Sequence, residues 1–231
     1  MIKLNDIQRI FDVGEQKVHA LDHLSLTIEQ GEYVSIMGPS GSGKSTLLNI
    51  IGLLDQATSG QYYLNNRDVT ALTELEKAQT RRSEIGFIFQ FFHLVPRLTA
   101  EENIALPMLL AGIPLSERKM RTHEILAAMG LGSRAKHRPD QLSGGQRQKV
   151  AIARATVMSP KVLLADEPTG NLDRHSGEEV IELIERLNQS GISLIVVTHD
   201  PTVGERAHRT IRMEDGSIVF DKDARSTHAT P

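Results

Sequence analysis

The sequence contains no cysteine and no tryptophan, and aromatic residues make up only 4% of its 231 residues. Without cysteine, the chain can form neither a disulfide framework nor a thiolate metal site. Its longest uncharged apolar stretch, residues 103–116, is too short to cross a bilayer and is broken by Pro107, Gly112 and Pro114. The first residues also lack the layout of a signal peptide. These absences predict a cytoplasmic chain without a membrane span of its own.

An excess of basic charge is also missing, since 26 Lys and Arg residues face 29 Asp and Glu residues, for a net charge of −3. The net charge of such a chain does not attract nucleic acids or anionic lipids. A local basic stretch contains Arg147, Lys149 and Arg154, but no aromatic residues are interleaved with it. We interpret it as solvated or facing another subunit, and we expect no nucleic-acid partner.

Several apolar runs predict an α/β core. Residues 33–37 form a short β-favouring run, and a helical pattern begins after Lys44. Residues 161–165 and 192–198 are nearly continuous apolar runs, which are typical of strands buried on both faces of a parallel sheet. Between them, residues 176–187 carry the apolar stripe of an amphipathic helix. The order strand, helix, strand therefore predicts a βαβ unit.

The middle and the end of the chain have a different pattern. From about residue 101 to 156 the periodicity is helical, with helices expected to be interrupted at Pro107, Pro114 and Pro139. Near the C-terminus, Asp215-Gly216 between two alternating runs predicts a β-hairpin. Residues 221–231 are expected to form a disordered tail.

The first motif lies between the predicted strand and helix near residue 40. Residues 38–45 read G-P-S-G-S-G-K-S and match the phosphate-binding loop G-x-x-x-x-G-K-[ST] in full. Its glycines let successive backbone N–H groups face one anion, and the following helix adds its positive N-terminal end. Lys44 would bridge the β- and γ-phosphates, Ser45 would ligate Mg²⁺ and Thr46 would donate to the α-phosphate. A flexible Gly/Ser turn is the alternative, which the flanking strand and helix disfavour.

The nucleotide contacts of this loop are therefore predicted at Gly38, Ser40, Gly41, Ser42, Gly43, Lys44, Ser45 and Thr46.

Two adjacent carboxylates, Asp166 and Glu167, follow the apolar run at residues 161–165, where parallel strands present ligands. Asp166 can hold a hydrated Mg²⁺, and Glu167 can polarise the attacking water as a general base. Alternatively, both are solvated loop charges, or Glu167 caps a helix. The phosphate loop in the same sheet favours the catalytic interpretation.

Residues 142–146, L-S-G-G-Q, form the third motif and precede a helical pattern. Two glycines at a helix start expose backbone amides to an anion, assisted by the Ser143 hydroxyl and the helix dipole. Ser143 as an ordinary N-cap is the simpler alternative. Taken in order, the three motifs resemble the ATP-binding cassette ATPases of ABC transporters. In that family this signature faces the nucleotide of the opposite subunit, which implies this role for Ser143, Gly144, Gly145 and Gln146.

The same resemblance implies further site residues. Gln90 matches the Q-loop glutamine, which senses Mg²⁺ or the water and signals to the membrane subunit. Asp173 lies in a matching D-loop at the dimer interface, and His199 matches the histidine that contacts the γ-phosphate and orients Glu167. Phe11 aligns with the aromatic residue that stacks on adenine, although a core role is the alternative. The implied catalytic set is Glu167, His199, Lys44 and Gln90, and the implied Mg²⁺ ligands are Ser45, Gln90 and Asp166. The other eight histidines are interpreted as having no functional role.

The resemblance covers about residues 1–220 and implies an architecture. It is a P-loop NTPase (RecA-like) α/β core with an N-terminal antiparallel β-subdomain, formed by residues 1–90 and 159–220. An α-helical subdomain is inserted at residues 91–158.

Within the family, three stretches are most similar to the ATPases of macrolide-exporter and lipoprotein-releasing systems, namely residues 89–112, 165–173 and 196–219. This likeness implies two ATP between two head-to-tail copies, at the cytoplasmic face of the inner membrane. It also implies a separate permease, with which a periplasmic adaptor can be associated. The permease is expected to dock near Gln90 and the apolar residues Phe91, Phe92, Leu94 and Leu98.

Two other functions remain open on sequence grounds. Soluble ABC-type proteins that act on ribosomes or DNA usually carry two cassettes or a long coiled-coil insertion, and this chain has neither. A regulatory nucleotide-binding module has no need of Glu167 and His199. The sequence does not encode the cargo, nor whether ATP drives transport or mechanical signalling.

Overall fold

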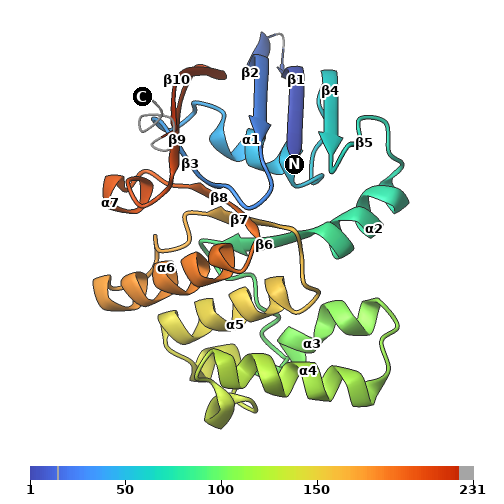
Figure 1. Ribbon diagram of the computed structural model, residues 1–231, viewed down its shortest axis with the longest axis vertical. Helices are drawn as coiled ribbons and strands as arrows, with labels where there is room; N and C mark the ends of the chain where they lie inside the picture. Colours follow the sequence, from blue (N-terminus) through green and yellow to red (C-terminus); the bar gives the residue numbers. More distant parts are fainter. Residues whose placement is uncertain (15, 224–231) are drawn as a thin grey trace, which may run out of the picture.

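The computed structural model describes residues 1–14 and 16–223. The antiparallel sheet lies at the top of the molecule, a second sheet runs from the upper left into the middle, and a layer of helices lies below (Figure 1). The antiparallel sheet has the order β2-β1-β4-β5, from strands β1 (Ile2–Val13), β2 (Gln16–Ile28), β4 (Ser59–Leu64) and β5 (Arg67–Asp68). The second sheet has the order β10-β9-β3-β8-β7-β6, from strands β3 (Tyr33–Met37), β6 (Ile85–Phe89), β7 (Val162–Asp166), β8 (Ser193–Val197), β9 (Arg209–Glu214) and β10 (Ser217–Asp223).

The helices are α1 (Lys44–Ile51), α2 (Glu74–Glu84), α3 (Ala100–Leu110), α4 (Leu115–Ala128), α5 (Gly144–Thr156), α6 (Arg174–Gln189) and α7 (Pro201–Gly204), with short 3₁₀ turns η1 (Gly132–Arg134) and η2 (Pro139–Gln141). The elements from α3 to α5 all lie between β6 and β7 in the chain and form the lower part of the molecule in Figure 1. Within the described residues, every helix is too short or too polar to span a bilayer.

The central strands are parallel and separate two hydrophobic cores. Leu164 of β7 and Ile195 of β8 face a core shared with α1 and the antiparallel sheet. Their neighbours Leu163 and Leu194 face the other core, which contains α5 and α6. Because successive side chains alternate between the faces of a strand, both faces of these strands are apolar, as their continuous hydrophobic runs predict. Four loops that carry predicted site residues therefore follow β3, β6, β7 and β8 at the carboxyl edge of one sheet.

The expected interruption at Pro107 is wrong, because α3 continues through this residue. Proline inside a helix costs about 3 kcal/mol. Ile104 and Met108, which flank it, are fully buried and together contribute about 3–6 kcal/mol. Burial therefore outweighs the missing hydrogen bond. Pro114 and Pro139 do interrupt the helices, since Pro114 precedes α4 and Pro139 begins η2.

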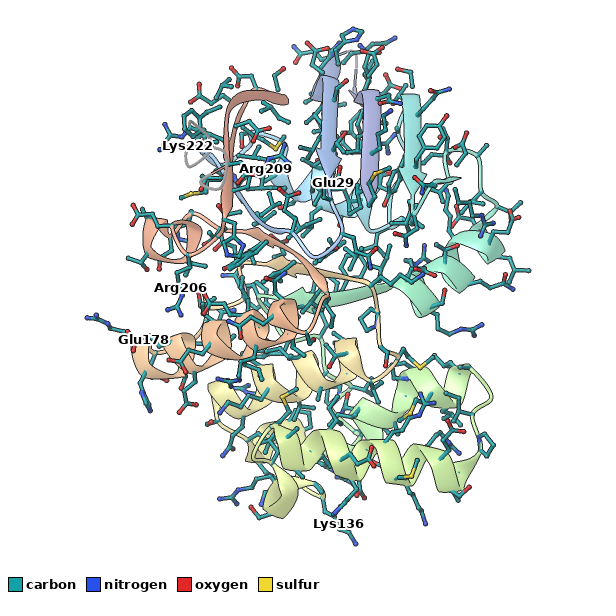
Figure 2. The ribbon with its side chains drawn as sticks, in the orientation of Figure 1. Glu29, Lys136, Glu178, Arg206, Arg209 and Lys222 are labelled. Atoms are coloured by element: carbon teal, nitrogen blue, oxygen red, sulfur yellow. The ribbon has the colours of Figure 1, made fainter. Side chains whose placement is uncertain are left out.

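The expected hairpin is present, with Asp215 and Gly216 at positive φ between β9 and β10. The tail prediction is wrong for residues 221–223, because β10 extends to Asp223. Arg209 on β9 holds this extension through two hydrogen bonds to the Asp221 carboxylate, at 2.6 and 2.7 Å. It also donates to the Thr27 carbonyl of the antiparallel sheet. Figure 2 labels Arg209 beside the final hairpin. Residues 224–231, the rest of the predicted tail, lie outside the described residues.

Candidate functional site

A cavity of about 420 Å³ lies over the loop between β3 and α1. Loop residues, the ends of β7 and β8 and part of β2 line it. Its lining includes the predicted residues Gly38, Ser40, Gly41, Gly43, Lys44, Ser45, Thr46, Asp166, Glu167 and His199. Among the predicted residues of the loop, Ser42 alone is absent from the lining, because its side chain is buried.

The start of α1 leaves backbone donors available. Its N-cap residue is Gly43, which offers no side-chain cap, and no acidic residue lies in the first turn. The first N–H groups of a helix have no partner within the helix and carry the positive end of its dipole. This helix terminus therefore fits an anion such as a phosphate.

The Lys44 ammonium group folds over the loop. Its Nζ donates to the carbonyl oxygens of Gly38 at 2.9 Å and Pro39 at 2.7 Å, and lies 3.4 Å from the Ser42 hydroxyl. These neutral acceptors hold the ammonium at the mouth of the loop. Because charge-assisted hydrogen bonds to an anion are stronger, phosphate oxygens can replace them.

Two loop glycines give a matched prediction. Gly41 and Gly43 have φ values of 83° and 94°, but a Cβ on Gly43 would lie 2.3 Å from the Ala20 carbonyl oxygen, whereas a Cβ on Gly41 would meet nothing within 4 Å. Both alanine variants incur about 1–2 kcal/mol for left-handed backbone. Gly43→Ala should lose further stability and at least tenfold in ATP affinity relative to Gly41→Ala. Thermal unfolding and ATP titration check this, and equal losses would contradict the role of the backbone clash.

Glu167 is held in a fixed orientation at the rim of the cavity. Its Oε1 accepts hydrogen bonds from the backbone N–H of His199 at 2.9 Å and from the His199 ring at 2.7 Å. Its Oε2 accepts from the Thr198 hydroxyl at 3.3 Å. The residue has a φ of 46°, which its own backbone bonds to Val197 and Gly170 support. A carboxylate fixed in this way, with its remaining lone pairs open to the cavity, is suited to accept a proton from a bound water.

His199 responds to this carboxylate. The hydrogen bond from its ring and the charge of Glu167 raise the pKa of His199. A raised pKa in the folded state gives stability that is fully present below the ordinary histidine pKa near 6.5 and is lost as pH rises through the folded value.

We therefore expect His199→Gln to lower Tm more at pH 6 than at pH 9. The imidazole is mostly exposed, so the effect should be small, about 1–3 °C. The measurement is thermal unfolding at both pH values, with His123→Gln on α4 as the control. A loss that is equal at the two pH values would show that the ion pair does not contribute.

The oxygen donors near Asp166 fit a magnesium ion. Asp166 is partly buried, and burial together with the charge of Glu167 raises its pKa, so a nearby cation would relieve an unfavourable negative charge. Ser45 adds a hydroxyl to the same cavity. In residues 1–14 and 16–223 there is no cluster of three or more His, Asp and Glu side chains that could hold a metal. Asp166 and Ser45 suit Mg²⁺, which often takes one or two carboxylates and completes its shell with water and substrate phosphates.

The signature residues do not line this cavity. Ser143 caps α5 by accepting from the Gln146 N–H at 3.2 Å, and the Gln146 side chain accepts from the Ser143 N–H, so the simpler N-cap interpretation is also true. Gly145 packs against Ser176 of α6, where a Cβ would meet its hydroxyl at 2.9 Å. Asp173 caps α6 by accepting from the Ser176 N–H at 3.0 Å. The structure thus brings the signature next to the predicted D-loop, on a second surface.

Gln90 and Phe11 also lie outside the cavity lining. Gln90 follows β6, and its backbone carbonyl accepts from the Asn171 side chain at 3.0 Å. Phe11 on β1 pairs with Val18, a residue of the cavity wall, and its ring lies 4.2 Å beneath the Arg9 guanidinium. Its side chain is 36% exposed, so it is not a core residue.

The sequence missed several residues around the site. Thr198 supports Glu167, and Val18, His19 and Ala20 form one cavity wall. No motif marks this wall, because β2 reaches it only through sheet pairing.

The basic stretch was also misjudged. Lys149 pairs with Glu179 of α6 at 2.7 Å, and Arg154 is partly buried and donates to the carbonyls of Phe92 and His93. These side chains hold elements of the same chain together, rather than serving only as solvated charges.

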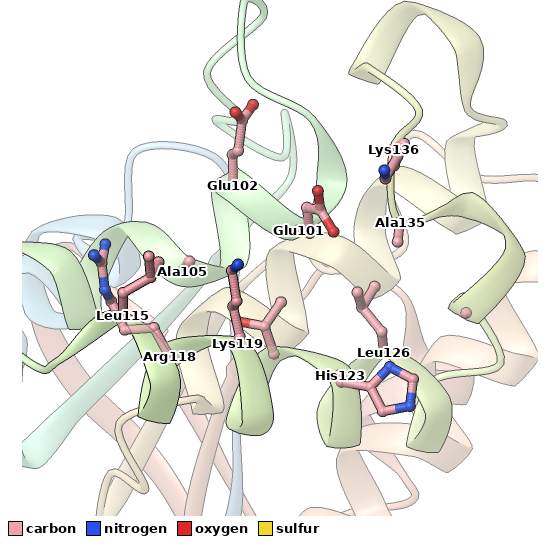
Figure 3. Close-up of a pocket in the computed structure, with 12 residues that line it drawn as sticks. Glu101, Glu102, Ala105, Leu115, Arg118, Lys119, His123, Leu126, Ala135 and Lys136 are labelled. Carbon is pink, nitrogen blue, oxygen red and sulfur yellow. The ribbon is translucent and has the colours of Figure 1, made fainter.

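A larger cavity of about 660 Å³ lies between α3, α4 and the segment after η1. Figure 3 shows charged side chains of both signs around it, namely Glu101, Glu102, Arg118, Lys119 and Lys136, together with the His123 ring. Nothing in the sequence indicated this cavity.

Comparisons with known proteins agree with these observations. Residues 21–170 match the family model described as ABC transporter. A Bacillus subtilis protein named as an uncharacterized ABC transporter ATP-binding protein is 47% identical over 99% of this chain and its own full length. A macrolide export ATP-binding/permease protein of Marinobacter nauticus is 50% identical over 97% of this chain, which spans only 35% of that relative.

A solved dimeric ATP-binding cassette, in a post-hydrolysis state bound to ADP and Pi, has a TM-score of 0.90 at 44% identity and covers 96% of this chain and 98% of its own. This match confirms the predicted fold, a P-loop NTPase core with an antiparallel β-subdomain and a helical insertion. The family model, the full-length relative and the structural match together show that the chain belongs to the ABC transporter family, as an ATP-binding cassette that hydrolyses ATP.

Proposed function

We propose that two copies of this chain close head to tail around two ATP molecules and drive a separate membrane permease at the cytoplasmic face of the membrane. The observation that carries the proposal is the Glu167 carboxylate, which His199 and Thr198 fix at the rim of the phosphate-loop cavity. This arrangement suits hydrolysis better than nucleotide sensing, because sensing needs no oriented base.

The predicted site residues have the following roles in the proposed reaction. The loop N–H groups and Lys44 bind the β- and γ-phosphates. Glu167 accepts a proton from the water that attacks the γ-phosphorus, while the bond to the β–γ bridging oxygen breaks and ADP retains that oxygen. His199 keeps Glu167 in place during this transfer. Asp166 and Ser45, with Gln90 as a further oxygen donor, would hold Mg²⁺, which neutralises phosphate charge when bound.

The second copy is proposed to supply a further phosphate-binding surface that the cavity of one chain does not contain. The N-terminus of α5, with Ser143 and Gly144, is a second surface suited to phosphate and lies outside the phosphate-loop cavity. In a head-to-tail pair, this surface of one copy would contact the γ-phosphate held by the other, and Asp173 would lie near the interface. The dimeric state of the related solved cassette supports this arrangement.

The permease is proposed to dock on the face formed by the turn after β6, by α3 and by α4. Phe91 is 69% exposed there, whereas Phe92, Leu94 and Leu98 are partly buried. The exposed apolar surface continues at Leu109, Leu110, Leu115 and Met120. The adjacent cavity in Figure 3 adds charges of both signs, which suits an amphipathic protein segment. We call this the docking face.

The relatives indicate the class of transporter. Several are named macrolide export ATP-binding/permease proteins, and this chain spans about a third of their length. We propose export, or extraction from the membrane or the periplasmic side, of a macrolide, lipoprotein or peptide type of cargo. A periplasmic adaptor is a proposed further component of such an assembly.

The test uses the Glu167→Gln variant, which is expected to bind ATP without turnover and to trap the closed dimer. Light scattering should show a dimer with Mg-ATP and a monomer without it. Gentle solubilisation of native membranes with ATP should then co-purify an integral membrane permease. Persistent monomer with ATP would refute the dimer, and co-purification of ribosomes or DNA would replace the transport function by a soluble one.

A further inference from the structure

A buried glutamine on the signature helix joins the ends of two site strands. Gln148 of α5 is fully buried, and its Nε2 donates to the Pro168 carbonyl at 2.7 Å and to the Phe89 carbonyl at 3.3 Å. Pro168 directly follows Glu167, and Phe89 directly precedes Gln90. One side chain therefore connects α5 to the backbone beside both residues.

The buried Oε1 atom of Gln148 has no hydrogen-bond partner. Burying an unpaired acceptor is unfavourable, so volume alone would favour an apolar side chain at this position. An apolar side chain, however, would not have the two N–H donors of the Gln148 amide. The two strand-end carbonyls are acceptors only, and the amide is oriented to serve both of them.

Farther along the same helix, Arg154 holds the turn that follows Gln90. It donates to the Phe92 carbonyl at 3.0 Å and to the His93 carbonyl, and burial lowers the pKa of this guanidinium. Phe92 and His93 have positive φ values of 60° and 47°, a conformation that side chains seldom adopt without support. The guanidinium of Arg147 lies 5.0 Å from the centre of the Phe92 ring. The turn that carries exposed Phe91 is thus fastened to α5.

We propose that Gln148 and Arg154 are positioning residues that make α5 the mechanical link between the ATP site and the docking face. Gln148 fixes the strand ends beside Glu167 and Gln90 relative to the signature at the start of α5. Arg154 fixes the turn that follows Gln90, which is part of the docking face, to the same helix. If α5 moves toward the nucleotide held by a partner copy, the backbone beside Glu167 would move with it. The turn that carries Phe91, where the permease is proposed to dock, would move as well. This inference rests on the proposed function of Glu167 and of the docking face.

The first test replaces the donors of Gln148. Gln148→Met keeps the length of the side chain and should lower kcat about tenfold or more, with KM for ATP within twofold, because the phosphate loop is untouched. The matched control is Lys149→Met on the same helix, which removes only the pair with Glu179. If kcat of the two variants agrees within twofold, Gln148 has no positioning role.

Gln148→Glu separates hydrogen bonding from packing and serves if the methionine variant does not fold. The new carboxyl group can donate to a carbonyl only when it is protonated, and burial favours that form. Because that form has one O–H where the amide has two N–H donors, kcat relative to the parent should be about tenfold low at pH 8 and recover only in part at pH 6. If the ratio of the Gln148→Glu kcat to the parent kcat does not change with pH, Gln148 only fills space and has no positioning role.

The second test follows the turn by hydrogen exchange. Arg154→Met should increase exchange of the amides at residues 92 and 93 at least tenfold, while Arg186→Met on α6, a largely exposed control, should not. In the Glu167→Gln protein, Mg-ATP should alter exchange at this turn, and adding Arg154→Met should abolish that response. If Arg154→Met leaves the exchange at residues 92 and 93 unchanged, or leaves its response to Mg-ATP unchanged, α5 does not link the ATP site to the docking face. If Glu167→Gln itself still turns over ATP, the assignment of Glu167 as the base fails, whatever the Gln148 and Arg154 variants show.

Discussion

Glu167→Gln should lower kcat for ATP hydrolysis by about 10²–10⁴-fold while leaving the Kd for ATP within a few-fold. The amide has the same shape as the carboxylate but cannot accept the proton of the attacking water. Binding is expected to persist because the loop donors and Lys44 are unchanged. Phosphate release and equilibrium nucleotide titration on the same preparation measure the two quantities.

A matched control removes one negative charge in the same way, but at a carboxylate that lies away from the cavity. Glu178→Gln alters an exposed carboxylate on α6 that pairs with Arg174 at 3.4 Å, and it should leave kcat unchanged. Near-normal turnover of Glu167→Gln would sink the assignment of the base. A loss of ATP binding in that variant would instead point to a collapse of the rim held by His199 and Thr198.

Lys44→Ala should weaken ATP binding by roughly 10- to 100-fold, corresponding to about 1.5–3 kcal/mol for a hydrogen bond to a charged group. The ammonium already lies at the mouth of the loop, 2.7 Å from the Pro39 carbonyl, so little rearrangement is needed for it to reach a phosphate. Since the variant also removes loop contacts, a modest fall in Tm should accompany the loss. Titration calorimetry and thermal unfolding separate the two effects.

Lys161→Ala is the control for this charge change. Lys161 immediately precedes β7, at the end of the sheet opposite to the cavity, and pairs there with Glu84 at 3.1 Å. Its removal should leave ATP affinity unaltered. Unchanged affinity in Lys44→Ala would contradict the phosphate-loop interpretation.

Features set by neighbouring residues could be predicted from the sequence. The strand at residues 33–37, the glycine loop and α1 follow one another directly, and the Asp215-Gly216 turn depends on two residues. The errors at Pro107 and at the end of β10 have another origin. Burial of Ile104 and Met108 and the pair between Arg209 and Asp221 are tertiary contacts, which no local pattern reveals.

The same distinction applies to the site. Motif residues such as Lys44 and Glu167 meet in one cavity because parallel strands end at the same edge. Residues that support them do so across long separations, as Thr198 does for Glu167 and Gln148 does for the strand ends. Arg154 was predicted to be solvated or to face another subunit, yet its partners are backbone carbonyls some sixty positions earlier in the same chain.

The position of β3 in the sheet also governs when the protein becomes able to bind nucleotide during its synthesis. β3 leads into the phosphate loop, but its two neighbours in the sheet, β8 and β9, come much later in the chain. The Gly216 N–H, from the final hairpin, donates to the Ser42 carbonyl of the loop. Because such long-range pairing cannot precede the emergence of both partners, a nascent chain on the ribosome is expected to remain unable to bind ATP until β8, β9 and Gly216 have left the exit tunnel.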